Sequence, residues 1–303
     1  MVASVSPWPV IGEPELLARL AMPDEQFIAH ISGWTRGMGR REFTEEIYAR
    51  ALGYPWPRPA QSFLLTGDVV TALGDLEATA REALLAELGG AESPRHPLLA
   101  FGSNGSPETL ALKFAHLPES ERRLLVIAGD LHDFDVGAAA GPTLYGSLPA
   151  TIFPSTGTAV RASVLWVTTV QLVALTWTEI SYRLGRLGGV CFAADEPRAP
   201  ALDHVYAFVS RWGAHRVDGD VIAMQAIPAT GRTGPALTQE QLLDHIAALA
   251  FGPASRSRDL VMRVMDDFGA AAAAIVPVLR ATARPFRSEH WTAYPAARHA
   301  ARG

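Results

Sequence analysis

Cysteine is nearly absent from this chain of 303 residues, and lysine is equally scarce. Cys191 is the only cysteine, which excludes internal disulfides and cysteine-rich zinc sites and favours a reducing compartment. Within the segment GGVCF, we expect it to be a small buried apolar side chain. Lys113 is the only lysine, and it does not stand in a P-loop of the form GxxxxGKS/T. Schiff-base chemistry would therefore depend on Lys113 alone.

Several other signatures are missing as well. GxSxG, which marks the nucleophile turn of α/β-hydrolases, and GxGxxG, which marks dinucleotide binding, do not occur. The first residues, MVASVSPWPVIGEPE, have neither the basic segment nor the sustained apolar segment of a signal peptide. The longest apolar run, 268–279, is mostly alanine, contains Pro277 and is too short to cross a membrane. We therefore expect a cytoplasmic protein without a membrane partner.

The formal net charge of −5 is distributed without long runs of one sign. Proteins that bind nucleic acids concentrate basic residues on one face. We therefore expect no nucleic-acid partner, and a small molecule or another protein instead. No pattern in the sequence indicates an oligomeric state.

Residues 1–95 are dominated by helical periodicity and predict an N-terminal helical extension. Apolar residues recur three and four apart in EPELLARLA, DEQFIAHIS and REFTEEIYARAL, and a longer helix is expected over DVVTALGDLEATAREALLAEL. The proline-rich segment GYPWPRPAQSF is expected to be irregular or extended. The segment GGAESPRHP, residues 89–97, has the composition of a linker.

Residues 96–232 predict a strand-rich domain, because short segments rich in β-branched and aromatic residues alternate with turns. Two helices are expected among the strands, over 107–115 and over 170–183. The expected strand segments are PLLAF, LLVIAG, ATIF, SVLWVT, VCFA, HVYAFVS and VIAMQAI.

Helical periodicity returns in residues 233–284, which are expected to pack on this core. The segment LTQEQLLDHIAALAF has Thr238 as its expected N-cap, and SRSRDLVMRVMDDFGAAAAAIVPVL follows it. The arginine-rich residues 285–303 have the composition of a disordered tail.

One loop has the form of a ligand-binding turn. The strand PLLAF is followed by the tetrapeptide GSNG, residues 102–105, and then by Ser106 and Pro107 in the positions of a helix N-cap and first residue. A strand, a flexible loop and a helix N-terminus direct free backbone N–H groups toward one point, and proteins bind carboxylates and developing oxyanions in this way. Most turns of this composition are only turns, so the loop alone decides nothing.

Four segments that include this loop form an ordered pattern in the middle third of the chain. They are FGSN (101–104), LHDF (131–134), the segment with Gly146, ATIF, Gly157 and VLW (146–166), and Leu175 with Glu179. The pattern resembles that of the gamma-glutamylcyclotransferase family. That family has Y/F-G-S-N after its first strand, then L-x-D-F, then G-x-A-T-I-F before a glycine turn, and finally a helix with a leucine and the catalytic glutamate.

The resemblance implies an α+β fold with a small mixed β-barrel or sheet as its core, to which N- and C-terminal helices are added in this chain. It also implies cleavage of a γ-glutamyl amide without water. The substrate's own α-amine attacks the side-chain carbonyl, which releases 5-oxoproline and an amine. Closure of a five-membered ring supplies the proximity, and neither a metal nor a cofactor is implied.

The resemblance assigns the role of general acid and base to Glu179, since one buried carboxylate can transfer both protons. The residues alone favour a helix-surface glutamate paired with Arg183, and it is the resemblance that favours the catalytic role. Likewise, Tyr182 could be either a substrate contact or a buried structural tyrosine. The residues expected to bind substrate are Phe101, Gly102, Ser103, Asn104 and Tyr182.

Two other functions stay open at this point. One is a binding or regulatory protein of the same fold that keeps the pocket without turnover. The other is an enzyme of the same fold that acts on a different amide.

The acidic segment DLHDFD, residues 130–135, is not expected to hold a metal ion. Side chains alternate along a strand, so His132 would lie on the opposite face from Asp133 and Asp135.

Overall fold

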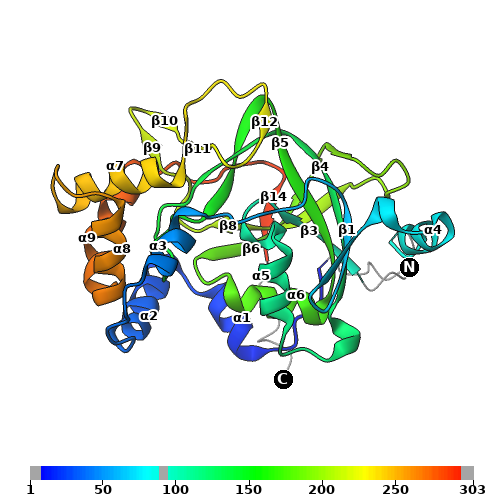
Figure 1. The fold of residues 1–303 in the computed structure, drawn as a ribbon, viewed down its shortest axis with the longest axis horizontal. Coiled ribbons are helices and arrows are strands. Elements are labelled where there is room, and N and C mark those ends of the chain that lie inside the picture. Colours follow the sequence, from blue (N-terminus) through cyan, green and yellow to red (C-terminus); the bar gives the residue numbers. More distant parts are fainter. Residues whose placement is uncertain (1–7, 89–94, 295–303) are drawn as a thin grey trace.

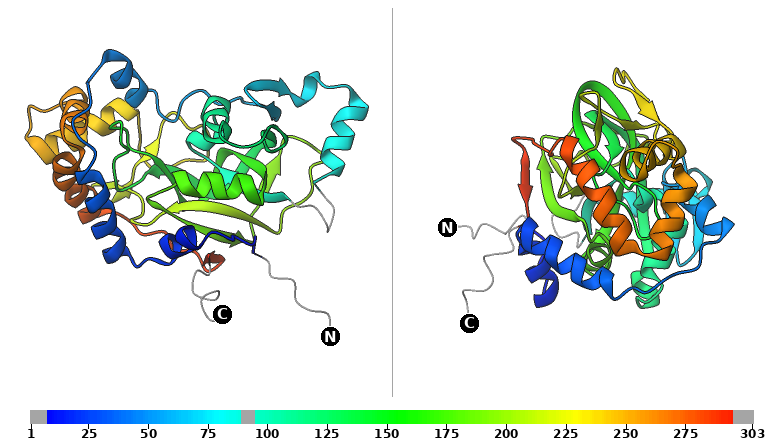
Figure 2. Two further views of the ribbon diagram at one scale, coloured as in Figure 1. Left: turned by 90° about the horizontal axis from the view of Figure 1, so that it is seen from below. Right: turned by 90° about the vertical axis from the view of Figure 1, so that its left-hand side faces the viewer.

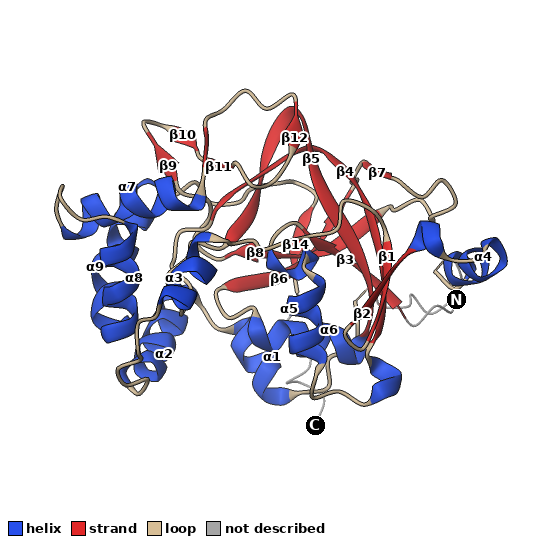
Figure 3. Cartoon of the chain, viewed as in Figure 1, coloured by secondary structure: helices blue, strands red, loops and turns tan. Residues whose placement is uncertain are grey.

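The computed structural model describes residues 8–88 and 95–294. These residues form an α+β structure around a mixed sheet of twelve strands, which confirms the α+β class, although the sheet is larger than the small core that was expected (Figures 1 and 3). The strands are β1 (Phe63–Thr66), β2 (Val69–Ala72), β3 (Arg95–Ala100), β4 (Arg123–Ala138), β5 (Ala150–Thr168), β6 (Tyr182–Gly188), β7 (Phe192–Ala194), β8 (His204–Ser210), β11 (Ala223–Met224), β12 (Ala229–Thr230), β13 (Ala236–Leu237) and β14 (Trp291–Ala293). A separate two-stranded ribbon contains β9 (Arg216–Val217) and β10 (Asp220–Val221).

The long antiparallel pair of β4 and β5 forms the centre of the sheet. The main strand order is β13-β11-β4-β5-β3-β8-β6-β14, and β3 is antiparallel to β5 but parallel to β8. Strands β1 and β7 pair with β4, while β12 pairs with β5. Because β3 lies between β5 and β8, the loop that follows β3 begins in the middle of the sheet.

The helices are grouped at different parts of the sheet (Figure 1). Helices α2, α3, α7, α8 and α9 gather at one end of the molecule, and the views of Figure 2 keep them together. Helix α4 lies at the opposite end, while α5 contacts α6. The α-helices of the described residues are α1 (Pro14–Ala21), α2 (Asp24–Arg36), α3 (Glu45–Leu52), α4 (Ala78–Ala86), α5 (Pro107–Phe114), α6 (Thr169–Thr178), α7 (Gln239–Phe251), α8 (Ser257–Asp266) and α9 (Phe268–Thr282). Short 3-10 helices are η1 (Leu73–Asp75), η2 (Ser103–Gly105) and η3 (Glu119–Glu121).

Apolar side chains are buried on both faces of the sheet, and the continuous apolar runs Leu124–Ala128 of β4 and Val164–Val167 of β5 fit this position. Adjacent residues of β3 enter different clusters: Leu98 packs with Leu110 of α5 and Leu175 of α6, whereas Leu99 packs with Ile152 on the other face. A third cluster holds α7, α8 and α9 together. The confirmed helices include 107–114, and Thr238 caps α7 in a reciprocal capping box with Gln241.

The long helix expected over residues 68–88 is wrong for its first part, and the preceding residues 63–66 form a strand. Residues 63–72 form the hairpin β1–β2, and β1 continues the central sheet with Phe63 opposite Val126 of β4. The turn uses Gly67 at a φ of 64°, and the β-branched run Val69–Thr71 favours a strand over the expected long helix. Only α4 remains of that helix.

The helix expected over 170–183 is also too long. Helix α6 ends at Thr178, and the chain then enters β6, which was not predicted and pairs antiparallel with β8. Gly185 of β6 lies under the ring of Trp291 in β14, where a Cβ atom would come within 2.3 Å of that ring. The expected disordered tail is therefore wrong as far as Tyr294, because β14 belongs to the sheet.

Three further outcomes concern single segments. Cys191 is exposed, so the expectation of a buried thiol is wrong. Residues 89–94 of the expected linker and 295–303 of the expected tail lie outside the described residues. None of the helices within 8–88 and 95–294 combines the length and the apolar character that crossing a bilayer requires.

Candidate active site

A cavity of about 370 Å³ lies between α2, α3, α5 and the end of α6. Its volume falls within the range of small-molecule sites. Apolar and aromatic side chains predominate in its wall, and Ser103, Lys113 and Glu179 contribute polar groups. A smaller space of about 30 Å³ runs along the loop after β3 and is also lined by Glu179. The loop and the glutamate singled out by the sequence therefore share one site.

The fold places Glu179 at the point where α6 ends. The helix begins with a capping box in which Thr168 and Gln171 exchange hydrogen bonds, and the Gln171 amide also donates to the Glu121 and Arg123 carbonyl oxygens. At the other end, Glu179 is the C-cap, and its N–H donates to the Leu175 carbonyl oxygen. Its side chain is 13 % exposed, so the carboxylate is mostly removed from solvent.

Two polar side chains meet at Glu179 Oε1. Asn104 Nδ2 donates to it at 3.0 Å and Lys113 Nζ donates at 2.8 Å. Lys113 Nζ also donates to Asn104 Oδ1 at 2.8 Å, which closes a triangle of hydrogen bonds. The Lys113 side chain is only 16 % exposed, and such charge-assisted bonds are stronger than neutral ones. The triangle joins η2, α5 and the end of α6.

The second carboxylate oxygen, Glu179 Oε2, accepts no hydrogen bond from the described residues. One oxygen of the carboxylate is thus held, while the other is left for a group that enters the cavity. A carboxylate oriented in this way can exchange a proton with a ligand within hydrogen-bond reach. The alternative pairing with Arg183 is not observed, because Arg183 Nη2 binds Asp24 Oδ1 at 2.7 Å.

The glycines of the loop make room for side chains of the same chain. A Cβ atom on Gly102 would lie 2.8 Å from the Tyr54 hydroxyl and 3.1 Å from Ala150 Cβ. A Cβ atom on Gly105 would lie 2.9 Å from Cδ of Arg58, whose Nη1 donates to the Phe101 carbonyl oxygen at 3.0 Å. At both glycines the space is therefore taken by side chains of the same chain, Tyr54 and Arg58, and not left for a ligand.

Two tyrosines flank the start of β5. The Tyr54 hydroxyl accepts from the Ala150 N–H at 2.8 Å, and the Tyr182 hydroxyl donates to the Ala150 carbonyl oxygen at 2.7 Å. Tyr182 is buried, and its one hydroxyl proton is already used. Burial raises the pKa of both phenols, and it raises the pKa of the nearby Tyr145 to about 12. At neutral pH these side chains are uncharged and cannot act as bases.

The structure brings the sequence-predicted residues together in part. Phe101, Gly102, Ser103 and Asn104 lie beside Glu179 and Tyr182 around the smaller space. Asn104 is directed at Glu179, and Tyr182 is directed at Ala150. Ser103 also lines the larger cavity.

Sequence reasoning missed Tyr54, the place of Lys113 and the aromatic wall. Available signals were the two aromatic residues within the prolines of GYPWPRP, and the single lysine of the chain on the helix that follows the loop. Tyr54 is positioned by the turn after α3, in which the Trp56 N–H donates to the Gly53 carbonyl oxygen at 2.8 Å.

The acidic segment 130–135 is a structural feature. A bulge between His132 and Phe134 gives Asp133 a φ of 61°, so strict alternation fails there. Asp135 is buried and is bound by Arg232 through two bonds of 2.7 Å. Among the residues that the structure describes, no group of three or more His, Cys, Asp or Glu side chains could hold a metal ion.

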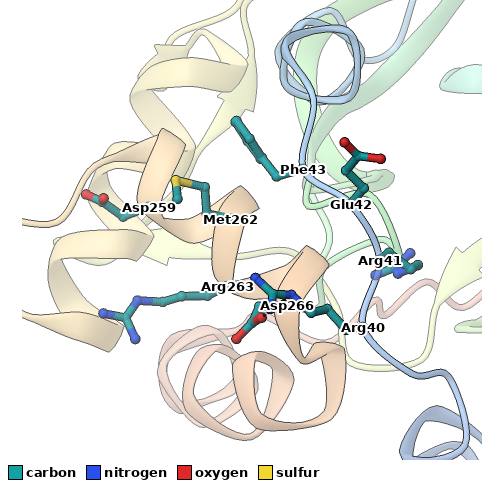
Figure 4. Close-up of a pocket in the computed structure, with 8 residues that line it drawn as sticks. All are labelled: Arg40, Arg41, Glu42, Phe43, Asp259, Met262, Arg263 and Asp266. Atoms are coloured by element: carbon teal, nitrogen blue, oxygen red, sulfur yellow. Dashed lines mark ion pairs between the residues drawn. The ribbon is translucent and has the colours of Figure 1, made fainter.

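A second, larger cavity of about 750 Å³ lies between the segment 40–43 and α8 (Figure 4). Its charged groups are of both signs, and Arg40 pairs with Asp266 at 2.9 Å while both side chains stay largely exposed. Exposed pairs of this kind bind each other weakly, and the charged side chains of this cavity lie close to solvent, where a ligand gains little from them. The lining residues are Arg40, Arg41, Glu42, Phe43, Asp259, Met262, Arg263 and Asp266. We therefore regard the cavity at Glu179 as the better candidate.

Comparison with other proteins adds nothing to this geometry: no protein-family model matches the chain, and no curated protein sequence does.

Proposed function

We propose that the chain is a gamma-glutamylcyclotransferase-like enzyme of the cytoplasm, which cleaves a γ-glutamyl amide into 5-oxoproline and an amine. The observation that carries the proposal is the carboxylate of Glu179, whose side chain is only 13 % exposed. One of its oxygens is fixed by Asn104 and Lys113, the other has no hydrogen-bond partner among the described residues, and Glu179 lines both the cavity and the smaller space along the loop at 102–104.

The reaction transfers two protons between neighbouring atoms. The substrate's α-ammonium first gives a proton to Glu179 Oε2, and the freed amine then attacks the γ-carbonyl carbon. A new C–N bond closes the five-membered ring as the carbonyl oxygen becomes anionic. The original amide C–N bond then breaks as Glu179 returns the first proton to the leaving nitrogen, and Glu179 passes the second proton of the ring nitrogen to the released amine, which departs as an ammonium. Atoms and charges balance without a metal, a cofactor or water.

The remaining site residues have positioning roles in this proposal. Lys113 and Asn104 hold the carboxylate at Oε1, so that Oε2 keeps one direction. Ser103 lines both cavities, and its hydroxyl is the group that the loop offers to the developing oxyanion. The Tyr182 hydroxyl holds the first residue of β5, Ala150, in place, and the Tyr182 side chain forms part of the cavity wall.

The arrangement of the four motif segments supports the finer fold proposal, a cyclotransferase-type core with added helices. FGSN follows β3, LHDF lies in β4, ATIF and VLW lie in β5, and Glu179 follows α6. The strands β3, β5 and β4 are direct neighbours in the sheet. The segments that resemble the family are therefore contiguous in space as well as ordered along the chain.

The test is incubation of the purified protein with γ-glutamyl amino acids and amines, with 5-oxoproline followed by mass spectrometry. The wild type is expected to form 5-oxoproline. Glu179→Gln keeps the shape but cannot accept the proton, and we expect it to lose about a hundredfold or more of the rate. Glu240→Gln, on the surface of α7, is the matched control and should retain the wild-type rate.

Absence of 5-oxoproline from every substrate would contradict the enzymatic proposal. If γ-glutamyl compounds then still raised the melting temperature of the protein, the alternative of a binding or regulatory protein with the same pocket would be favoured.

A further inference from the structure

The outer part of the cavity at Glu179 is built from aromatic and bulky apolar side chains. Tyr54, Trp56 and Tyr145 form a continuous set in which successive ring centroids lie 5.5 Å apart. Trp34 of α2 and Leu112 of α5 also line the cavity, and they are 45 % and 61 % exposed. Large apolar side chains that remain exposed in a concave wall favour a ligand that covers them.

The charges of this cavity are unequal. Of the described residues that line it, Glu179 is the only carboxylate, and it is paired with Lys113. Arg50 of α3 is the remaining cation, with its guanidinium 4.4 Å from the Trp56 ring centroid and 5.9 Å from that of Tyr145. Its nearest acidic partner, Glu108, lies at 3.9 Å and is 70 % exposed, so this pairing is weak. The cavity therefore carries an excess of positive charge.

We propose that the leaving group is an aromatic α-amino acid, so that the substrate is a γ-glutamyl aromatic amino acid. This inference rests on the proposed function and names the substrate class of the same site. The γ-glutamyl part lies between the loop at 102–104 and Glu179, and the aromatic ring packs on the rings of Trp56 and Tyr145. The carboxylate of the released amino acid pairs with Arg50.

The same charges act against other amines. A leaving group with a second ammonium, such as a diamine, would bring a cation toward Arg50 and Lys113 and would find no unpaired carboxylate among the described lining residues. A small leaving group such as alanine would leave the aromatic wall in contact with water.

The experiment compares four probes by the formation of 5-oxoproline: γ-glutamylphenylalanine, γ-glutamylphenethylamide, γ-glutamylalanine and γ-glutamylputrescine. We expect kcat/KM for γ-glutamylphenylalanine to exceed that for γ-glutamylalanine by about tenfold, through ring contacts. It should exceed that for the phenethylamide, which lacks the carboxylate, by about fivefold. The putrescine derivative should be the poorest substrate. Equal values for phenylalanine and alanine, or a preference for putrescine, would overturn the inference.

Two variants with matched controls test the individual contacts. Arg50→Gln is expected to abolish the preference for γ-glutamylphenylalanine over the phenethylamide, whereas Arg40→Gln in the other cavity should keep it. Leu112→Ala is expected to raise KM for γ-glutamylphenylalanine about threefold. Leu249→Ala, an exposed leucine of α7 that does not line the cavity, should leave KM unchanged. Unchanged ratios and KM in Arg50→Gln and Leu112→Ala would contradict the assignment.

Failure of the inference and failure of the proposed function give different results. If 5-oxoproline forms without selectivity, the leaving-group assignment fails and the enzymatic proposal stands. If no 5-oxoproline forms, the enzymatic proposal fails, and calorimetric binding of the same four probes to the wild type tests the pocket alone. Tighter binding of γ-glutamylphenylalanine would then support the pocket assignment, while equal or absent binding would overturn it.

Discussion

Gly102 has no side chain, and the space at its Cα is filled by the N-terminal region. The Tyr54 hydroxyl and Ala150 Cβ would lie 2.8 Å and 3.1 Å from a Cβ atom at this position. Tyr54 is buried and its hydroxyl is held by the Ala150 N–H, so it cannot easily move aside. The glycine thus keeps the loop, the start of β5 and the segment after α3 in contact.

Gly102→Ala is therefore expected to lower the free energy of unfolding by about 1–3 kcal/mol, the usual cost of overpacking a closed site. Urea denaturation measures the change. Gly74→Ala is the control, because a Cβ atom at Gly74 meets nothing within 4 Å. Removal of the hydroxyl by Tyr54→Phe should recover part of the loss in the double variant. A Gly102→Ala protein as stable as the Gly74→Ala protein would contradict this packing.

At the same scale, the residue types of the site were partly readable from the sequence. Glu179 stands alone as an acid in the apolar run LVALTWTEISYRL, and the loop glycines are visible in FGSNGSP. The bond from Lys113 to Glu179 could not be predicted, because 66 residues separate the two positions and their meeting depends on how α5 packs against α6.

Among the elements, β4 is held to the segment after β12 by a buried ion pair. Asp135 accepts two bonds from Arg232, one from Nε and one from Nη2, and Nη2 also donates to the Ile227 carbonyl oxygen. The two side chains are 2 % and 14 % exposed. Removal of one partner leaves an unpaired charge in a site with little water.

Arg232→Met keeps the length of the side chain but removes the charge, and it is expected to destabilise the fold by about 3–5 kcal/mol. Arg40→Gln, which breaks the exposed pair with Asp266, should change stability by less than about 1 kcal/mol. Chemical denaturation of both variants checks the contrast. Similar small losses in the two proteins would show that the Asp135 pair is more hydrated than its burial indicates.

Element types were predictable where one physical signal dominated. The helix after Ser106 and the capped helix after Thr238 have both a start signal and apolar periodicity, and both are present. The hairpin at 63–72 and strand β6 were missed because each gains its stability from a distant partner, β4 and β8 respectively. The β-branched run Val69–Thr71 is a local sign of a strand, but the partner strands β4 and β8 cannot be read from a local pattern.

For the molecule as a whole, the candidate site depends on three regions of the chain. Arg50 and Tyr54 come from the N-terminal region, Glu179 from the central region, and Phe268 from the C-terminal helices. The sequence pattern predicted a strand-rich central domain with helical regions before and after it. It did not indicate that residues of these helical regions line the cavity. Selectivity for a ligand therefore depends on the complete fold.

The free energy of unfolding of the whole molecule depends on pH through His215, which is 1 % exposed. Burial, together with the nearby His245 of α7, lowers the pKa of His215 to about 4, and Thr282 at the end of α9 lies 3.3 Å from its Nδ1. The unfolded chain restores a pKa near 6.5. Between pH 6.5 and 4, His215 is therefore protonated in the unfolded chain but not in the folded one. The contribution of neutral His215 to the free energy of unfolding is complete above pH 6.5 and is lost as the pH falls toward 4.

His215→Leu is expected to remove this component, so the unfolding free energy of the variant should fall less between pH 6.5 and 4 than that of the wild type. The difference should reach at most about 3 kcal/mol, since each pKa unit corresponds to about 1.4 kcal/mol. Urea denaturation across this pH range measures both curves, and carboxylates common to the two proteins cancel in the difference. His116→Leu, at an exposed position, is the control and should follow the wild type. Parallel curves for wild type and His215→Leu would show that His215 does not remain neutral in the fold.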